Sequence, residues 1–382
     1  MNSILQKLLA ATGLTRRGEL VEATEAIQRA LAGAVTAPPA AARPAAPAAA
    51  GPSSAEVLDG LVREVASAPA AADAASESAT EIEVDAPPDS ERTRTGGFTG
   101  SSFTAEAGTR SFKLFEPAGY DGRALPLVVM LHGCTQDPDD FAAGTRMNAL
   151  AQEHGLLVLY PAQAPRSNAH KCWNWFMPGD QRRGQGEPAL LAGMTRHVMA
   201  THRVDADRVW VAGLSAGGAM AAILAREYPD LFAAAGVHSG LPAGAAHDMV
   251  SAFSAMKSGA RNVPAADAAR SAPVIVFHGD ADTTVNALNG GHLVDAVLGA
   301  APAQATREPS PAASPGRAFT RTIYRPADAI DPAPSLAEHW VVHGAGHAWA
   351  GGDAAGSFTE SAGPDASREM LRFFAEHPRR TS

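Results

Sequence analysis

Apolar and polar residues alternate in blocks along most of the chain, from residue 98 onward. Short continuous apolar runs, such as Leu-Val-Val-Met-Leu at 127–131, are typical of strands buried on both faces. Polar-rich segments with helical spacing separate these runs. Strands are predicted at 111–116, 127–131, 156–160, 209–212, 233–237, 274–277 and 339–342. Helices are predicted at about 141–153, 187–203, 217–228, 289–298 and 364–376.

Strands that alternate with helices indicate a mostly parallel central sheet with helices on both faces. The predicted fold class is therefore α/β. A segment of this length can bury its own core, so residues 98–382 are predicted to form one domain.

The residues before this domain have a different character. Apolar residues recur every three or four positions between Leu20 and Leu31, which predicts a helical segment over 1–33. Helices this short are not stable alone, so we expect them to dock on their own domain, a second subunit or a particle surface. Residues 34–97 are rich in Ala and Pro and predict a flexible linker, interrupted by a short helix over 55–66.

Charge and hydropathy narrow the function classes. The net charge of −9 argues against a general affinity for nucleic acid or anionic membranes. No run of about 18 apolar residues predicts a transmembrane helix. The amino terminus lacks the apolar stretch of a secretory signal, and the pair at 16–17 is followed by charged residues. A cytoplasmic location is therefore expected.

The two cysteines, Cys134 and Cys172, are too few for a disulfide framework and lack the spacing of a zinc site. A single bond between them stays open on this evidence. No metal and no cofactor are expected.

The motif Gly-Leu-Ser-Ala-Gly at 213–217 fits G-x-S-x-G, and it stands between a predicted strand and a predicted helix. In this turn the serine backbone is strained, and the flanking glycines avoid collisions at close approach. The strain projects the hydroxyl from the end of the sheet. We therefore predict Ser215 as a nucleophile, the alternative being a purely structural turn.

A serine nucleophile needs an imidazole base and a carboxylate that orients it, in the chain order Ser, Asp, His for this kind of motif. The strand at 274–277 is followed by Asp280 and Asp282, and the carboxyl ends of parallel strands are where such sites form. The pattern His-Gly-x-x-Asp-x-x-Val favours Asp282. Asp280 is the rival, with loop stabilisation as its expected role.

Histidines for the base lie after two strands. His347 occupies a glycine-rich loop past the strand at 339–342 and is the predicted base. His343, nearer the strand, and His278, at the end of its own strand, are expected to be structural.

The tetrahedral intermediate of an ester reaction needs two N–H donors. The predicted donors are the backbone N–H groups of Ala216, after the nucleophile, and of Cys134, in the loop after the early strand at 127–131. A plain tight turn at 132–133 is the alternative. A catalytic thiol at Cys134 is disfavoured because no base pairs with it in the sequence.

Aromatic residues gather at 171–176, where Trp173 and Trp175 are expected to line a substrate groove or to form a local hydrophobic cluster. Trp349, two residues after His347, is expected to contact substrate. Gln136 and Leu214 complete the expected substrate contacts.

Five segments together resemble the polyhydroxybutyrate depolymerase family of esterases, which includes feruloyl and acetylxylan esterases. They are residues 131–136, 172–176, 213–218, 278–285 and 344–349. The resemblance covers about residues 98–377. It implies an α/β-hydrolase fold, a triad of Ser215, Asp282 and His347, an oxyanion hole at Cys134 and Ala216, and a Cys134–Cys172 disulfide.

The resemblance implies a serine esterase that acts through an acyl-enzyme on short-chain hydroxyalkanoate polyesters or oligomers, or on small acyl or aryl esters. A feruloyl- or acetylxylan-type carbohydrate esterase is one alternative. Another is a non-catalytic protein that binds a polymer granule or a partner through the segment at 1–33. No polymer-gripping domain is recognised after the last helix, so soluble oligomers, amorphous polymer or small esters are expected rather than crystalline polymer. A disulfide would fit a secreted protein better than a cytoplasmic one.

Overall fold

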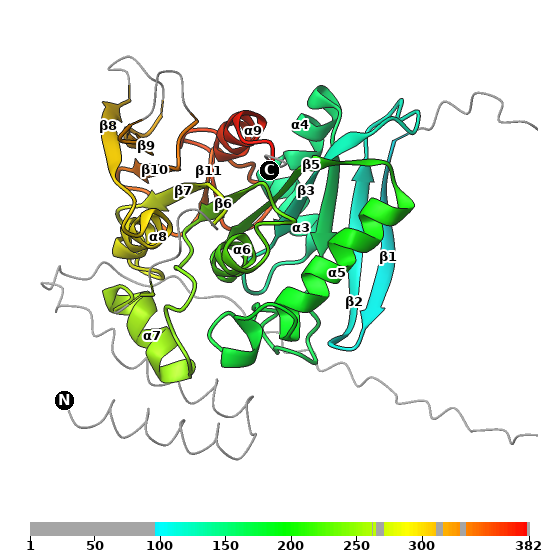
Figure 1. Cartoon of the computed structure of the whole chain (residues 1–382), viewed down its shortest axis with the longest axis horizontal. Helices are drawn as coiled ribbons and strands as arrows, with labels where there is room; N and C mark the ends of the chain where they lie inside the picture. Colours follow the sequence, from blue (N-terminus) through cyan, green and yellow to red (C-terminus); the bar gives the residue numbers. More distant parts are fainter. Residues whose placement is uncertain (1–95, 262, 265–270, 311–315, 329–333, 380–382) are drawn as a thin grey trace, which may run out of the picture.

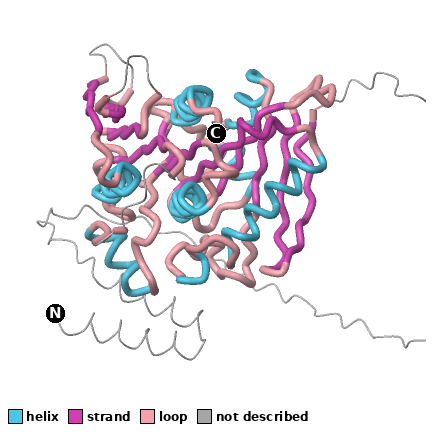
Figure 2. The backbone as a smooth tube through the Cα atoms, viewed as in Figure 1, coloured by secondary structure: helices cyan, strands magenta, loops and turns pink. Residues whose placement is uncertain are grey.

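The computed structural model describes residues 96–261, 263–264, 271–310, 316–328 and 334–379. Ten strands form one mixed sheet in the order β1-β2-β4-β3-β5-β6-β7-β10-β9-β8, and helices cover both of its faces (Figure 1). The sheet runs through the middle of the described domain, between the helices (Figure 2). This arrangement confirms the predicted α/β class.

The centre of the sheet is parallel, as the apolar runs predict. Its strands are β3 (Leu125–Leu131), β4 (Leu157–Pro161), β5 (Val204–Leu214), β6 (Ala234–His238), β7 (Val274–Gly279) and β10 (Ala337–Val342). Every residue of β3, β4, β6 and β7 is buried, because helices exclude water from both faces. The carboxyl ends of these parallel strands therefore meet at one edge of the sheet.

The two sides of the sheet are antiparallel. On one side β1 (Gly97–Ala105) pairs with β2 (Gly108–Glu116), and β2 pairs with β4. On the other side β8 (Ala303–Pro309) and β9 (Phe319–Pro326) extend the sheet beyond β10. Of these four strands only β2 is predicted by the sequence. β1 and β8 are largely exposed and β9 is only partly buried, so none of them carries the continuous apolar run that marks a fully buried strand.

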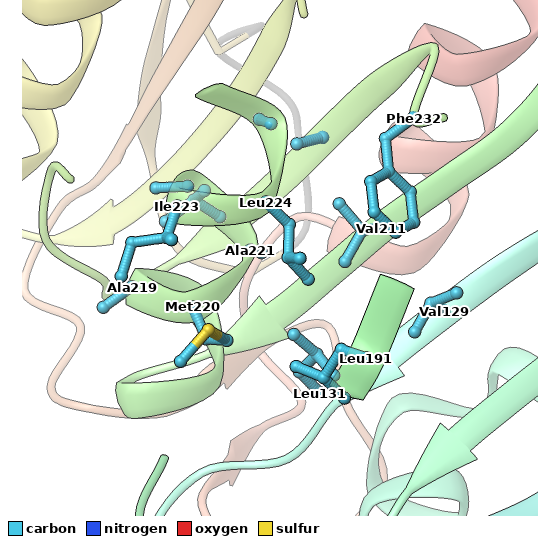
Figure 3. Close-up of a cluster of buried hydrophobic side chains, with 14 of the residues drawn as sticks. Val129, Leu131, Leu191, Val211, Ala219, Met220, Ala221, Ile223, Leu224 and Phe232 are labelled. Atoms are coloured by element: carbon cyan, nitrogen blue, oxygen red, sulfur yellow. The ribbon is translucent and has the colours of Figure 1, made fainter. Parts of the chain in front are cut away.

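Two hydrophobic layers hold the helices to the sheet. The first lies beneath α5 (Gly186–Thr201), α6 (Ala216–Glu227) and α8 (Leu288–Leu298). The second lies beneath α3 (Pro138–Thr145), α4 (Met147–His154) and α9 (Ala366–Glu376). Figure 3 shows the first layer, where Met220 and Leu224 of α6 pack with Val211 of β5 and Leu131 of β3. Successive residues of β3 alternate between the two layers, so this strand packs against both.

Two helix predictions need correction. The single helix predicted over 141–153 is two helices, because Arg146 adopts a left-handed conformation with φ of 53° between them. An additional helix, α7 (Met249–Ser258), was not predicted. The remaining elements are short: the 3-10 helix η1 (Pro178–Asp180) and the paired strands β11 (Trp349–Ala350) and β12 (Thr359–Glu360).

The predicted helical segment at 1–33 lies outside the described residues. So does the predicted linker at 34–97, except for Gly96 and Gly97, the second of which already begins β1. In the part of the chain that the structure describes, no helix has the length and apolar character needed to cross a membrane.

Candidate active site

Ser215 lies in a tight turn between β5 and α6, at the carboxyl edge of the sheet. Its φ of 57° and ψ of −118° are a strained conformation for a residue with a side chain. Gly213 and Gly217 make the turn possible, since a Cβ on Gly213 would lie 2.4 Å from the carbonyl oxygen of Gly217. The backbone N–H of Ser215 donates to the oxygen of His238 on β6 at 2.9 Å, which fixes the turn to the neighbouring strand.

The loop after β3 lies directly beside this turn. A Cβ on Gly133 would be 3.6 Å from the Cβ of Ser215. Cys134 follows and is bonded to Cys172, which confirms the disulfide implied by the resemblance. Within the described residues, no acceptor is paired with the backbone N–H of Cys134 or of Ala216. Two unpaired donors therefore stand beside Ser215.

A cavity of about 210 Å³ opens at Ser215. Part of its wall is the disulfide with Trp175 and Phe176, and another part comes from α7. Its remaining lining residues are Asn168, His170, Ala216, Leu241 and Val285. Apolar side chains dominate this lining, so the cavity suits an apolar group of a ligand.

Asp282 and His347 form a hydrogen-bonded pair at the same edge of the sheet. His347 Nδ1 lies 2.7 Å from Asp282 Oδ2, and the two side chains are 11% and 0% exposed. Asp282 Oδ1 accepts the backbone N–H groups of Thr284 and Val285, each at 2.8 Å. Burial alone would raise the pKa of Asp282, but hydrogen bonds from His278 and His347 outweigh it and hold that pKa well below the usual range. The carboxylate is therefore ionised and can orient the imidazole of His347.

The rival residues pair with one another instead. His343 Nδ1 lies 2.8 Å from Asp280 Oδ2, and both side chains are 41% exposed. Asp280 Oδ1 accepts the N–H of Gly344, and His343 Nε2 lies 2.9 Å from Thr320 Oγ1. These contacts join two loops and β9, which matches the structural roles expected for both residues.

His238 links the segments that carry Ser215 and His347. Besides the backbone bond to Ser215, its ring Nε2 accepts the N–H of Ala350 at 2.9 Å. The ring stacks with Phe277 and Trp349, at centroid distances of 5.8 and 5.2 Å. Burial lowers the pKa of His238 to about 3, so the ring is neutral and Nε2 stays an acceptor at neutral pH.

The structure corrects most of the expected substrate contacts. Of the five residues only Trp175 lines the cavity. Trp173 and Trp349 are 0% and 1% exposed, because their rings fill the core and their indole N–H groups bond internally. Leu214 and Gln136 are also buried, at 1% and 2%. Gln136 holds the N–H of Gly133, so it supports the loop rather than facing the cavity.

The cavity wall from α7 is the part of the site that sequence reasoning missed. Met249, Ala252, Phe253 and Met256 line the cavity from one side of this helix. Their spacing of three, four and seven residues is a helical signal that could have revealed the element. Among the residues described by the structure, no group of three or more His, Cys, Asp or Glu side chains is arranged to hold a metal ion.

Comparison with known proteins places these features in a family. The family described as "Esterase PHB depolymerase" matches residues 110–305. Poly(3-hydroxyalkanoate) depolymerase C of Paucimonas lemoignei is 35% identical over 258 residues, which cover 65% of this chain. The matched region covers 60% of that relative's own length.

Feruloyl esterase B of Thermothelomyces thermophilus is 31% identical over 216 residues, which cover 52% of this chain and 72% of the relative. Among solved structures, the acetyl xylan esterase from Aspergillus awamori matches with a TM-score of 0.55 at 19% identity. That match covers 73% of this chain and 99% of the other, and it confirms the predicted α/β-hydrolase fold.

Proposed function

Because the chain belongs to the PHB depolymerase family of esterases, we propose that it hydrolyses carboxylic esters with Ser215 as nucleophile. The observation that carries this proposal is the strained turn at Ser215, which borders an apolar cavity together with two unpaired N–H groups. Backbone strain at a cavity is typical of sites where a reactive side chain is held in place. The buried Asp282–His347 pair at the same sheet edge supplies a base.

The proposed reaction proceeds through an acyl-enzyme. His347 takes the proton of Ser215 as its oxygen attacks the ester carbonyl, and then gives that proton to the departing alkoxide. The ionised Asp282 keeps the proton of the neutral ring on Nδ1 and stabilises the imidazolium that forms. The N–H groups of Cys134 and Ala216 receive the negative oxygen of the tetrahedral intermediate. Water, activated by the same histidine, then releases the acid and restores the serine.

Substitution of the nucleophile tests this proposal. Ser215→Ala should lower kcat for p-nitrophenyl butyrate by at least about 10⁴-fold, while the variant stays folded by circular dichroism. A variant that keeps wild-type turnover would exclude Ser215 as the nucleophile.

The size and lining of the cavity support short apolar acyl groups, with hydroxyalkanoate oligomers as the proposed substrate class. The relative from Paucimonas lemoignei, which is named for poly(3-hydroxyalkanoate), supports the same choice. A second candidate is an aryl ester such as a feruloyl ester, which is favoured by Trp175 and Phe176 in the cavity wall. A panel of hydroxybutyrate oligomers, methyl ferulate and acetylated xylan separates these classes. The oligomers should give the highest kcat/KM, and a preference for methyl ferulate would select the second candidate.

The disulfide supports a further proposal, that the protein works in an oxidising compartment. Disulfides persist in such compartments and are rare in the cytosol, so Cys134–Cys172 argues against the cytoplasmic location expected from the amino-terminal sequence. Alkylation of thiols in intact producing cells, followed by mass measurement, tests the proposal. An unmodified protein is expected. Alkylation of both cysteines would favour the cytoplasm.

A further inference from the structure

Glu187 is a buried carboxylate that the proposed reaction does not use. It lies in the first turn of α5 with its side chain 5% exposed. One oxygen accepts the backbone N–H of Asn174 at 2.7 Å, and the other accepts the side-chain amide groups of Asn174, at 3.0 Å, and of Gln163. The guanidinium of Arg110 lies 3.5 Å from that second oxygen. Every polar neighbour that contacts the carboxylate oxygens therefore donates to them. Burial, with the nearby charge of Asp180, raises the pKa of Glu187 to about 7, so the ionised form that accepts at both oxygens predominates above that pH.

Gln163 carries this contact toward the loop beside Ser215. Its side-chain amide also donates to the backbone oxygen of Cys172 at 2.9 Å. Its backbone N–H donates to His132 Nε2 at 3.1 Å. Because Nε2 is an acceptor, the ring proton is on Nδ1, which donates to the backbone oxygen of Gly133 at 2.7 Å. Burial lowers the pKa of His132 to about 4, so the ring is neutral at neutral pH. Its two hydrogen bonds then select the tautomer with the proton on Nδ1.

The hydrogen bond from His132 Nδ1 holds the peptide that joins Gly133 to Cys134, which carries one of the proposed oxyanion donors. The C=O of Gly133 and the N–H of Cys134 belong to one planar peptide, so fixing the oxygen also fixes the direction of the N–H. That N–H is one of the two proposed oxyanion donors. A donor of this kind is effective only within a narrow range of distance and angle to the developing charge.

The second contact of Glu187 leads to the wall of the cavity. Asn174 stands between Trp173, which is buried, and Trp175, which lines the cavity. The indole N–H of Trp173 donates to the backbone oxygen of His132 at 3.1 Å, so the wall is tied to the same loop. One carboxylate thus connects the substrate wall and the oxyanion peptide.

We propose that Glu187 is a positioning residue for the ester hydrolysis proposed above, which sets the direction of the Cys134 N–H through Gln163 and His132. The inference rests on that proposed function. Glu187 does not touch substrate. It acts by holding Gln163 and Asn174, and with them the oxyanion peptide and the wall, in one arrangement.

An amide cannot replace the carboxylate in this environment. In Glu187→Gln the new NH₂ group would face either the N–H of Asn174 or the amide donors of Gln163 and Asn174. If the Gln163 amide turned over to accept, it would lose its bonds to Cys172 and Arg110. Either outcome weakens the series of hydrogen bonds that runs from Glu187 through Gln163 and His132 to the Gly133–Cys134 peptide.

The test compares Glu187→Gln with the wild type at about pH 8.5, where the carboxylate is ionised, on p-nitrophenyl butyrate and on an alkyl trifluoromethyl ketone. Serine addition to the ketone gives an anionic tetrahedral adduct, so its Ki reports the oxyanion donors directly. We expect kcat to fall about 10- to 100-fold and Ki to rise by a similar factor, with KM within about threefold, since removal of a whole donor costs about 10²- to 10³-fold. Titration of reactive serine with an aryl phosphonate normalises kcat to the concentration of active enzyme, and Ki needs no such correction.

Asp180→Asn is the matched control. Asp180 accepts the backbone N–H of Glu187 at 2.7 Å and makes no hydrogen bond to Gln163 or Asn174 among the described residues. Its charge raises the pKa of Glu187, so its removal favours the ionised carboxylate and leaves the contacts of Glu187 with Gln163 and Asn174 in place. This variant should keep kcat and the ketone Ki within about twofold, even if its melting temperature falls. A loss as large as that of Glu187→Gln would reduce Glu187 to general support of the helix and overturn the inference.

Unchanged kcat and Ki in folded Glu187→Gln would also overturn the inference. If that variant does not fold, Glu187→Asp carries the test, because it keeps the charge and withdraws the acceptor by one methylene. It should lose about three- to tenfold in kcat with a matching rise in Ki, and unchanged values would overturn the inference. Absence of ester turnover and of phosphonate labelling in the wild type would instead contradict the proposed function itself.

Discussion

Two aspartate–histidine pairs join the same two loops, after β7 and after β10, and they differ in almost everything but distance. Asp282–His347 and Asp280–His343 have hydrogen bonds of 2.7 and 2.8 Å. The first pair is buried, and its carboxylate also accepts two backbone N–H groups. The second pair is 41% exposed on both sides, and its imidazole is occupied at the second nitrogen by Thr320.

The comparison teaches that a short carboxylate–imidazole distance does not identify a base. What differs is the environment of the pair. Val285, whose N–H binds Asp282, lines the cavity with Ser215, although none of the four paired side chains lines it directly. In a site with little water, a carboxylate interacts strongly with the imidazole beside it and so orients that ring. At the surface, solvent screens the same interaction. We therefore propose the buried pair, rather than the exposed one, as the pair that acts on Ser215.

Removal of the charge from the buried pair should have the largest effect. Asp282→Asn should lower kcat for p-nitrophenyl butyrate by about 10⁴-fold, because an amide permits the wrong tautomer of His347. Steady-state kinetics on the folded variant measure this. A fall in kcat smaller than tenfold would contradict the proposal that the buried pair, and not the exposed one, serves Ser215.

A disulfide also holds the wall of the cavity in place, whereas no covalent cross-link among the described residues holds the exposed Asp280–His343 pair. The Cys134–Cys172 bond closes a loop with a sequence separation of 38, and a loop of that size stabilises the fold by about 4 kcal/mol through chain entropy. The double variant Cys134→Ser, Cys172→Ser should lose about that much in urea unfolding. Reductant should destabilise the wild type and leave the double variant unchanged. Equal stability of the oxidised and reduced wild type would contradict this.

His238, which lies near the buried pair, should make the stability of the protein depend on pH. His238 interacts electrostatically with Asp282 and His347, and burial lowers its pKa to about 3 from an unfolded value near 6.5. At pH 5 the unfolded chain binds a proton that the folded ring excludes, so the free energy of unfolding falls as pH decreases below 6.5. His238 contributes about 2 kcal/mol of this loss between pH 8 and pH 5. His238→Gln should flatten the curve by that amount, and an unchanged slope would argue against a neutral buried ring.

The exposed pair should matter least. Asp280→Asn keeps an acceptor for the N–H of Gly344 and loses only a solvent-screened charge, worth less than about 1 kcal/mol. We expect kcat/KM within about threefold of the wild type. A loss of a hundredfold would show that this pair takes part in the reaction.

Much of this arrangement could be predicted from the sequence because strong local signals mark it. The buried central strands carry continuous apolar runs, and the glycines around Ser215 are required by the close approach in its turn. The strands β1, β8 and β9 escaped prediction because they lie toward the sides of the sheet, where exposed or partly buried residues leave no continuous apolar run.

The substrate contacts were predicted less well than the residues paired at the site. Trp349 is close to His347 along the chain, yet its ring packs between Phe141 and His238, which sequence proximity does not reveal. Trp175 faces the cavity and Trp173 does not, although both belong to one short aromatic segment. Which side of a loop faces substrate depends on tertiary packing, here on the Glu187 and His132 contacts.

The most direct measurement of the central claim compares His347→Gln with His343→Gln in parallel. Each variant removes the imidazole from one of the two pairs and leaves the other pair intact. We expect kcat/KM for p-nitrophenyl butyrate to fall by about 10⁴-fold or more in His347→Gln and to stay within about threefold in His343→Gln. Equal losses, or a larger loss in His343→Gln, would contradict the assignment of Asp282–His347 as the pair that serves Ser215.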